Sequence, residues 1–295
     1  MRYNTPMKKA NTQKSKTVSL VLGSGGARGL AHVGVIYWLE EHGYTIRSIS
    51  GCSMGALIGG FYATGGLEAY LEWLRKLDMF SLLNVLDFHG SGGLISGESL
   101  MKKMEQLVGD PAIETLPIRF TAVASDIDGE QEVWLGSGSL LQAIRASISL
   151  PMFFTPYRYR GKMLVDGGVL NPVPIAPTFH DDTDQIIAVN LGGDIDSSLR
   201  EKTDKTTEGF YEKIRHYMSE NLLPEALSNK MGFYQVADRS FDAMQGTIAR
   251  MKLAAYPPDV EITIPRNLCG TLEFDRVDEM IAAGYRYCEH AFRKS

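Results

Sequence analysis

The residue with the clearest potential for chemistry is Ser53, at the centre of a Gly-x-Ser-x-Gly segment that spans residues 51–55. In this motif the serine sits on a strained strand-to-helix turn, and small flanking residues, here Gly51 and Gly55, let the chain reverse. A helix that starts at Met54 would direct its N–H groups and positive end toward charge that develops beside Ser53. The segment therefore predicts a nucleophilic serine. An ordinary glycine-rich turn is the alternative, because such pentapeptides also recur by chance.

A second segment, residues 23–29 with the sequence GSGGARG, is almost free of side chains. Backbone N–H groups in such a loop can approach a ligand oxygen closely, which suits an oxyanion hole. Glycine-rich loops also bind dinucleotide phosphates, but the spacing from Gly23 is Gly-x-Gly-x-x-x-Gly, and no acid ends the next expected strand. Nucleotide binding is thus the weaker interpretation. Arg28 is open to two interpretations: attraction of anionic head groups, or a surface arginine with a solvated tip.

The third segment is Asp166-Gly167-Gly168, which follows an expected strand at residues 163–165. A carboxylate at the end of a strand, followed by two glycines, can lie close to another loop without steric blockage. It can then accept a hydrogen bond from a serine hydroxyl and orient that hydroxyl. A turn aspartate that stabilises its own loop is the alternative interpretation.

Three histidines follow Asp166 and have the chain position that a serine–acid–histidine triad would require: His180, His216 and His290. Only one strand–helix unit precedes the Ser53 segment, whereas α/β-hydrolases place several strands before theirs. His180 lies beside two aspartates in a polar stretch, and His290 lies near the end of an expected amphipathic helix. We therefore favour a site without histidine.

Hydrophobic periodicity predicts the elements that must position these segments. Two strand–glycine turn–helix units in succession, with strands at 18–22 and 46–50, indicate a parallel sheet covered by helices. Asp128-Gly129 is a good hairpin turn between strands at 118–124 and 132–135. The fold class is therefore α/β. Further strands are expected at 163–165, 186–190 and 260–264, and helices at 30–40, 67–77, 98–108, 139–147, 210–253 and 277–292.

Composition and charge limit the function classes. The chain has 295 residues and a net charge of −5, which gives no reason to expect nucleic-acid binding. Its three cysteines are too few and too scattered for a disulfide framework or a zinc site. Residues 1–16 are basic without a following apolar stretch, so we expect a disordered tail rather than a signal peptide. No segment approaches the ~20 apolar residues of a membrane helix, and peripheral contact of the tail with anionic lipid stays open.

One domain, residues 17–295, is expected, because the late strand at 260–264 suggests that the chain returns to the same sheet. Residues 192–209 are polar and charged, and we expect a mobile surface connection there. The apolar residues 79–88 are open to two interpretations, an acyl-chain wall or mobile cap on the one hand and ordinary core packing on the other.

The three segments, in this order, resemble the patatin-like phospholipases. The resemblance rests on residues 25–29 and 51–55 and on Asp166-Gly167-Gly168, together with residues 146–154 (ASISLPMFF), which are similar to another block of that family. It covers residues 17–193 well and the remainder loosely. Ser24 departs from the pattern, since many members have glycine there, but a small residue should leave the loop usable.

The resemblance implies a three-layer α/β/α fold with a mainly parallel central sheet, and a Ser–Asp dyad rather than a triad. It implies that Ser53 attacks an acyl carbonyl while Asp166 accepts or orients its proton, and that water then hydrolyses the acyl-enzyme. The other residues that it places in the site are the oxyanion-hole residues Gly25, Gly26, Ala27 and Arg28, the elbow residues Gly51, Met54 and Gly55, and the dyad-supporting Gly167 and Gly168.

The implied substrate is an acyl ester of a lipid, as for a phospholipase A, a lysophospholipase or an esterase, with head group and positional preference open. No metal or cofactor is expected, because the carboxylates show no dense ligand pattern. We expect a cytoplasmic protein. Contact with the inner face of a membrane and the oligomeric state are left open. A regulatory or interaction protein on the same fold is the main alternative, and a nucleotide-binding protein is the less favoured one.

Overall fold

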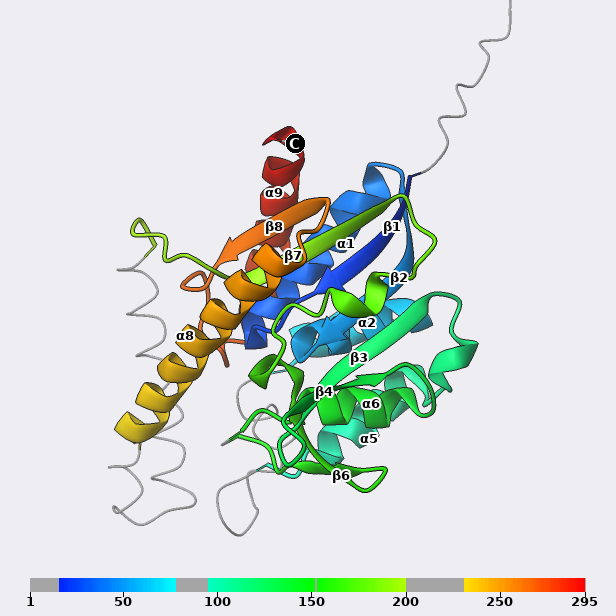
Figure 1. Ribbon diagram of the computed structural model, residues 1–295, viewed down its shortest axis with the longest axis vertical. Helices are drawn as coiled ribbons and strands as arrows, with labels where there is room; N and C mark the ends of the chain where they lie inside the picture. Colours follow the sequence, from blue (N-terminus) through cyan, green and yellow to red (C-terminus); the bar gives the residue numbers. More distant parts are fainter. Residues whose placement is uncertain (1–15, 78–94, 152, 200–230, 295) are drawn as a thin grey trace, which may run out of the picture.

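A computed structural model describes residues 16–77, 95–151, 153–199 and 231–294 (Figure 1). Several expectations lie wholly or partly outside these ranges: the basic tail, the apolar residues 79–88 and the polar connection beyond residue 199. The first part of the helical stretch expected at 210–253 lies outside them as well.

The described strands form one eight-stranded sheet in the order β5-β6-β3-β2-β1-β7-β8, with β4 paired to β3 beside this path. The five strands from β3 to β8 along this order are parallel, whereas β4, β5 and β6 pair antiparallel with their neighbours. Because β8 pairs with β7, the chain returns to this sheet after α8. The strands are β1 (Lys16–Leu22), β2 (Tyr44–Cys52), β3 (Arg119–Asp126), β4 (Gln131–Leu135), β5 (Tyr157–Tyr159), β6 (Lys162–Asp166), β7 (Gln185–Gly193) and β8 (Val260–Pro265).

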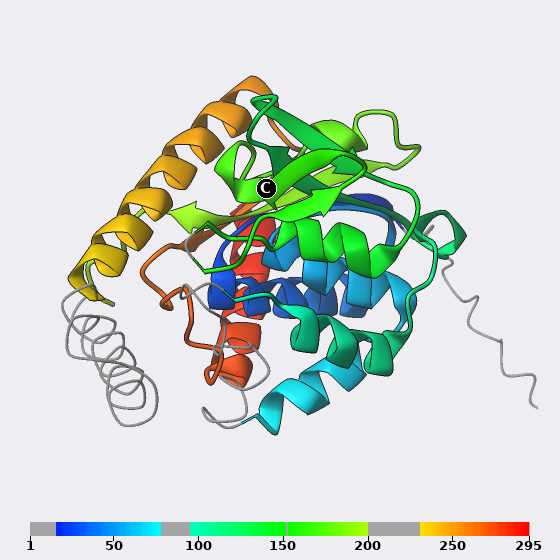
Figure 2. The same ribbon diagram turned by 90° about the horizontal axis from the view of Figure 1, so that it is seen from below.

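Helices cover both faces of the sheet, which gives three layers (Figures 1 and 2). One face carries α1 (Ala31–Glu41), α2 (Met54–Thr64), α3 (Leu67–Arg75), α5 (Glu98–Val108), α6 (Leu140–Ser147) and α9 (Val277–Lys294). The long helix α8 (Met231–Ala255) crosses the other face. Short 3-10 turns follow β1 at Gly26–Leu30 and β6 at Gly167–Val169, and others lie at Ile113–Thr115 and Ala176–Thr178. The α/β fold with three layers is confirmed.

Alternation of side chains along β1 produces the two interfaces of the sheet. Leu20 and Leu22 belong to the large apolar cluster that includes α1, α2 and α9. Val21, between them, packs in a smaller cluster with Ala249 and Leu253 of α8. Both faces of β1 are therefore buried, which explains the three consecutive apolar residues at its end, Leu20, Val21 and Leu22.

Element boundaries agree closely with the sequence expectations, and the helix expected at 98–108 has those limits. Two expected boundaries differ from the structure: the end of the N-terminal tail and the start of the polar connection after β7. β1 begins at Lys16, inside the expected tail, and Gly192 and Gly193 belong to β7 rather than to a mobile connection. The three-residue strand β5 was not predicted. No helix in the described ranges has the length and apolar character needed to cross a membrane.

Candidate active site

β2 runs into α2 at Ser53, and the turn between them is strained. Ser53 has φ 54° and ψ −126°, a conformation that residues with a side chain rarely adopt. The reversal brings α2 so close to the sheet that a Cβ on Gly55 would lie 2.1 Å from the Leu22 carbonyl oxygen. A Cβ on Gly51 would lie 2.5 Å from the Gly55 carbonyl group. Glycine is therefore required on both sides of Ser53, as the elbow motif predicts.

A buried hydroxyl holds the backbone of Ser53. The Ser53 N–H donates to Oγ of Ser147 at 2.9 Å, and that hydroxyl donates in turn to the Val123 carbonyl oxygen at 2.6 Å. The next two N–H groups, those of Met54 and Gly55, donate no hydrogen bond within the described ranges and lie at the positive end of α2. Ser53 itself is 8% exposed. A carbonyl oxygen that reacts at Ser53 would thus lie near two unoccupied N–H donors at the start of α2.

Asp166 ends β6 and is completely buried. Its Oδ1 accepts the N–H of Gly168 at 2.7 Å, and its own N–H donates to the Ser149 carbonyl oxygen at 3.0 Å. Oδ2 makes no hydrogen bond of ordinary geometry with a described residue. The following turn is tight, because a Cβ on Gly167 would lie 2.0 Å from the Val123 carbonyl oxygen. The two glycines after the aspartate therefore let the carboxyl group enter the interior of the site.

Burial raises the pKa of Asp166 to about 7. Loss of water disfavours the charged carboxylate, and this outweighs the opposing effects of the Ser53 side chain and of the Gly168 N–H, both of which lower the pKa. The two residues lie close together, because the turn after Asp166 packs against the elbow: a Cβ on Gly167 would lie 2.9 Å from Cβ of Cys52, the residue before Ser53. The structure thus brings together the serine and the aspartate of two segments that are far apart in the sequence.

The glycine-rich loop offers fewer N–H groups than the sequence indicates. The Ala27 N–H donates to the Thr271 carbonyl oxygen at 2.8 Å, and the Arg28 N–H donates to the Gly25 carbonyl oxygen at 3.2 Å. The N–H groups of Gly25 and Gly26 make no hydrogen bond within the described part of the chain. The expected oxyanion donors Ala27 and Arg28 are therefore occupied, and Gly25 and Gly26 are the loop residues whose N–H groups can meet a ligand.

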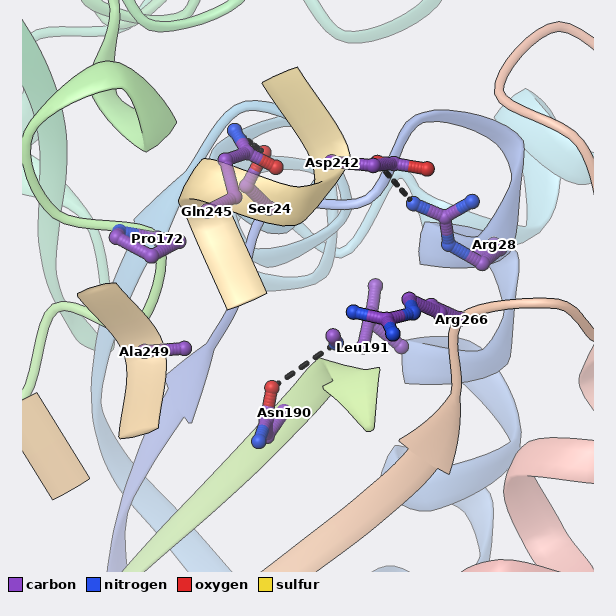
Figure 3. A pocket seen from close by; sticks show the side chains of 10 residues that line it. Ser24, Arg28, Pro172, Asn190, Leu191, Asp242, Gln245, Ala249 and Arg266 are labelled. Carbon is purple, nitrogen blue, oxygen red and sulfur yellow. Dashed lines mark hydrogen bonds and ion pairs between the residues drawn. The ribbon is translucent and has the colours of Figure 1, made fainter. Parts of the chain in front are cut away.

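Arg28 fits neither interpretation that the sequence left open. It is 3% exposed, and its guanidinium forms an ion pair with Asp242 of α8 at 2.8 Å and donates to the Cys269 carbonyl oxygen at 3.1 Å. It is therefore neither a surface arginine nor a cation free to attract head groups. Instead it ties the glycine-rich loop to α8 (Figure 3). The sequence carried no signal for this pairing, because the two residues are 214 positions apart.

α8 makes two further side-chain contacts, one with the glycine-rich loop and one with β4. Gln245 donates to Oγ of Ser24 at 3.1 Å, and Lys252 forms an ion pair with Glu132, which also accepts a hydrogen bond from Asn171. Between α8, the end of β7 and the glycine-rich loop lies a small polar pocket (Figure 3). Neither Ser53 nor Asp166 lines it. The pocket is therefore distinct from the serine–aspartate pair.

The histidines do not complete a triad in the described structure. His180 and His290 are exposed, and His216 lies outside the described ranges. His32, which the sequence did not single out, is fully buried, and its Nε2 donates to the Gly23 carbonyl oxygen at 2.8 Å. Burial lowers the pKa of His32 to about 4, so the ring is neutral at pH 7. His32 therefore supports the start of the glycine-rich loop as a neutral donor.

Comparison with known proteins gives four results. The sequence model of a family described as patatin-like phospholipase matches residues 20–179. An uncharacterised NTE family protein of Mycobacterium bovis is 35% identical over 92% of this chain and 89% of its own length. The lysophospholipase NTE1 of Pyricularia oryzae is 29% identical over 92% of this chain, which spans only 18% of that protein. The crystal structure of VipD from Legionella pneumophila superposes with a TM-score of 0.53 at 15% identity, covering 95% of this chain and 67% of VipD.

Proposed function

This chain belongs to the patatin-like phospholipase family, and from that premise we propose that it hydrolyses acyl esters of lipids through a Ser53–Asp166 dyad. One observation carries the proposal. A serine in a strained conformation at the start of a helix lies beside a fully buried carboxyl group whose Oδ2 has no hydrogen-bond partner in the described ranges. Strain of this kind persists where the surrounding structure holds it, and it is concentrated at functional sites.

In the proposed acylation step, Oγ of Ser53 attacks the carbonyl carbon of the ester, and Asp166 takes the hydroxyl proton. The tetrahedral intermediate then collapses, the bond to the leaving alcohol breaks, and the protonated Asp166 returns its proton to that alcohol. Asp166 with a pKa of about 7 suits both halves of this step, because a general base and acid works best near the operating pH. An aspartate with an ordinary pKa near 3.8 would be a much weaker base.

The negative charge on the carbonyl oxygen needs donors that are in place before the reaction begins. We assign this role to the N–H groups of Gly25 and Gly26 in the glycine-rich loop and of Met54 at the start of α2. These groups are unoccupied in the described structure, whereas the Ser53 N–H is used by Ser147. In the second half of the reaction Asp166 takes a proton from a water molecule, whose oxygen attacks the acyl carbon of the acyl-enzyme. The bond between that carbon and Oγ of Ser53 then breaks, the fatty acid leaves, and Asp166 returns the proton to Oγ of Ser53.

The substrate class rests on the relatives. The name of the Pyricularia oryzae relative describes a lysophospholipase, and the family description names phospholipases. We propose that this chain acts on lysophospholipids and related monoacyl esters, without metal or cofactor. A cytoplasmic location and peripheral contact with a membrane surface remain predictions.

The test is release of fatty acid from lysophosphatidylcholine and from a short-chain p-nitrophenyl ester. Wild type is expected to hydrolyse both, and Ser53→Ala is expected to lose turnover by up to about 10⁶-fold. Hydrolysis of the short ester alone would support the dyad but contradict the lysophospholipid assignment. Equal turnover by wild type and a folded Ser53→Ala protein would contradict the proposed mechanism.

A further inference from the structure

The end of α6 contacts the backbone of both residues of the proposed dyad. Ser147, the last residue of α6, accepts the N–H of Ser53 at 2.9 Å. Two residues later, the Ser149 carbonyl oxygen accepts the N–H of Asp166 at 3.0 Å. Ser147 and Ser149 are both fully buried. One short segment therefore holds the nucleophile strand and the aspartate strand at a fixed separation.

The direction of the hydrogen bonds at Ser147 is determined by their partners. The Val123 carbonyl oxygen can only accept, so the Ser147 hydroxyl must donate its proton there, over 2.6 Å. Its lone pairs are then directed to the Ser53 N–H, which can only donate. The Ser147 hydroxyl is thus a fixed link between β3 and the elbow, with no freedom to rotate to another partner.

The other end of the segment is fixed as well. Arg145 donates to Oγ of Ser149 at 2.6 Å and to the Ser96 carbonyl oxygen at 2.7 Å. Its guanidinium also lies 5.3 Å from the ring centre of Phe154. These contacts hold the chain after α6 against its neighbours, so the Ser149 carbonyl oxygen that binds Asp166 has little freedom to move.

We propose that Ser147 is a positioning residue for the Ser53 nucleophile, an inference that rests on the proposed function. Its hydroxyl holds the strained Ser53 backbone at the distance from Asp166 at which the proton can pass. It also occupies the Ser53 N–H, so that the donors facing the oxyanion are those of α2 and the glycine-rich loop. Ser147 touches neither the substrate nor the reacting atoms, and it acts through Ser53.

Loss of the Ser147 hydroxyl has a specific consequence. In Ser147→Ala, the Ser53 N–H loses its acceptor and the Val123 carbonyl oxygen loses its donor, both in the interior. Ser53 can then leave its strained conformation and move away from Asp166. A displacement of about 1 Å in a reacting group can lower the rate about 100-fold. Substrate binding should change little, because the contacts of the substrate with the rest of the site remain.

The experiment compares Ser147→Ala with two matched controls in the full chain. Ser50→Ala removes the same atom from another buried serine, whose hydroxyl has no hydrogen-bond partner in the described structure. Ile144→Val removes one methyl group from the core face of α6 without touching either hydrogen bond. The measurements are kcat and KM on a p-nitrophenyl ester, the rate of labelling by a fluorophosphonate, and the urea midpoint of unfolding.

We expect Ser147→Ala to lose about 10- to 100-fold in kcat and in labelling rate with KM changed less than about twofold, while both controls keep wild-type values. Labelling of Ser147→Ala as fast as that of Ser50→Ala would overturn the proposal. An equal fall in all three variants that follows their urea midpoints would overturn it too, because it would indicate a general loss of stability. Wild-type protein that is not labelled at Ser53 would instead contradict the proposed function.

Hydrogen exchange of the wild-type protein tests the same link without a substitution. An amide that donates to a buried, fixed hydroxyl should exchange slowly, so the Ser53 amide is expected among the protected amides of β2 and α2. Fast exchange of the Ser53 amide, with slow exchange of its neighbours in β2, would overturn the proposal even if Ser147→Ala did not fold.

Discussion

The N–H of Gly168 donates to Oδ1 of Asp166 at 2.7 Å, and so the turn after the aspartate occupies one of the two carboxyl oxygens. Oδ2 is left without a partner of ordinary geometry in the described chain, and the Ser53 side chain is the group that interacts with this carboxyl from another segment. The turn therefore determines how the carboxyl is oriented, and burial determines how readily it takes a proton.

The rate should depend on the ionisation of Asp166. With a pKa of about 7, this group is mostly protonated below neutral pH and cannot accept the Ser53 proton. We expect kcat on a soluble ester to rise as pH increases through about 7 and then to level off. Asp166→Asn should lose about 10²- to 10⁴-fold in kcat, and its residual rate should lack this rise. A wild-type profile that is flat between pH 5 and 8 would contradict the role of Asp166.

The same carboxyl should make the stability of the protein depend on pH. Its pKa is raised from 3.8 to about 7 in the folded state, so between these values the folded protein holds a proton that the unfolded chain releases. The stabilising contribution is complete below about pH 4 and is lost as pH rises through 7. Asp166→Asn has no such loss, so its unfolding free energy should exceed that of wild type at pH 8 by up to about 4 kcal/mol. Urea unfolding at pH 4 and pH 8 measures the difference, and a gap that does not widen with pH contradicts the expectation.

Gly55 should not tolerate a side chain. A Cβ there would lie 2.1 Å from the Leu22 carbonyl oxygen, so Gly55→Ala must displace α2 or β1 and should cost about 1–3 kcal/mol or more, with loss of activity. Gly136→Ala is the matched control, because a Cβ at Gly136 meets nothing closer than 3.5 Å. Chemical denaturation and ester turnover of both variants test this. Wild-type activity in Gly55→Ala would mean that the elbow is looser than described.

The ion pair between Arg28 and Asp242 should support the glycine-rich loop. Asp242→Asn removes the carboxylate charge that pairs with the buried guanidinium of Arg28, and we expect a loss of about 3 kcal/mol in unfolding free energy. The kcat should fall as well, because Gly25 and Gly26 belong to the loop that this pair anchors. The exposed pair of Arg293 with Glu289 is the control, and Glu289→Gln should cost less than about 1 kcal/mol. Equal effects of the two substitutions would show that α8 does not hold the loop.

Local sequence patterns predicted the parts of the site whose geometry depends on neighbouring residues. The elbow needs small residues directly beside Ser53, and the turn after Asp166 needs glycine at the next position, so both were visible as short motifs. The parallel sheet could also be predicted from local patterns, because two strand–turn–helix units follow each other directly in the sequence. Contacts between residues that are close in the sequence restrict the residue types at those positions, and this restriction is visible as a short motif.

Contacts between segments that are far apart in the sequence produced no such motif. The occupation of the Ala27 N–H by Thr271 and the burial of Arg28 against Asp242 depend on segments that meet only in the folded chain. The hydroxyl of Ser147 lay in a block similar to the family pattern, but its partner Ser53 is 94 positions away. The sequence therefore indicated which segments lie close together better than which of their N–H groups are unoccupied.

The nucleophilic role of Ser53 is tested most directly by covalent labelling with a fluorophosphonate, followed by mass spectrometry of the labelled peptide. Wild type, Ser53→Ala and Ser50→Ala are compared under conditions in which all three are folded. We expect an adduct on Ser53 in wild type and in Ser50→Ala, and none in Ser53→Ala. An adduct on another residue, or equal labelling of Ser53→Ala and wild type, would contradict it.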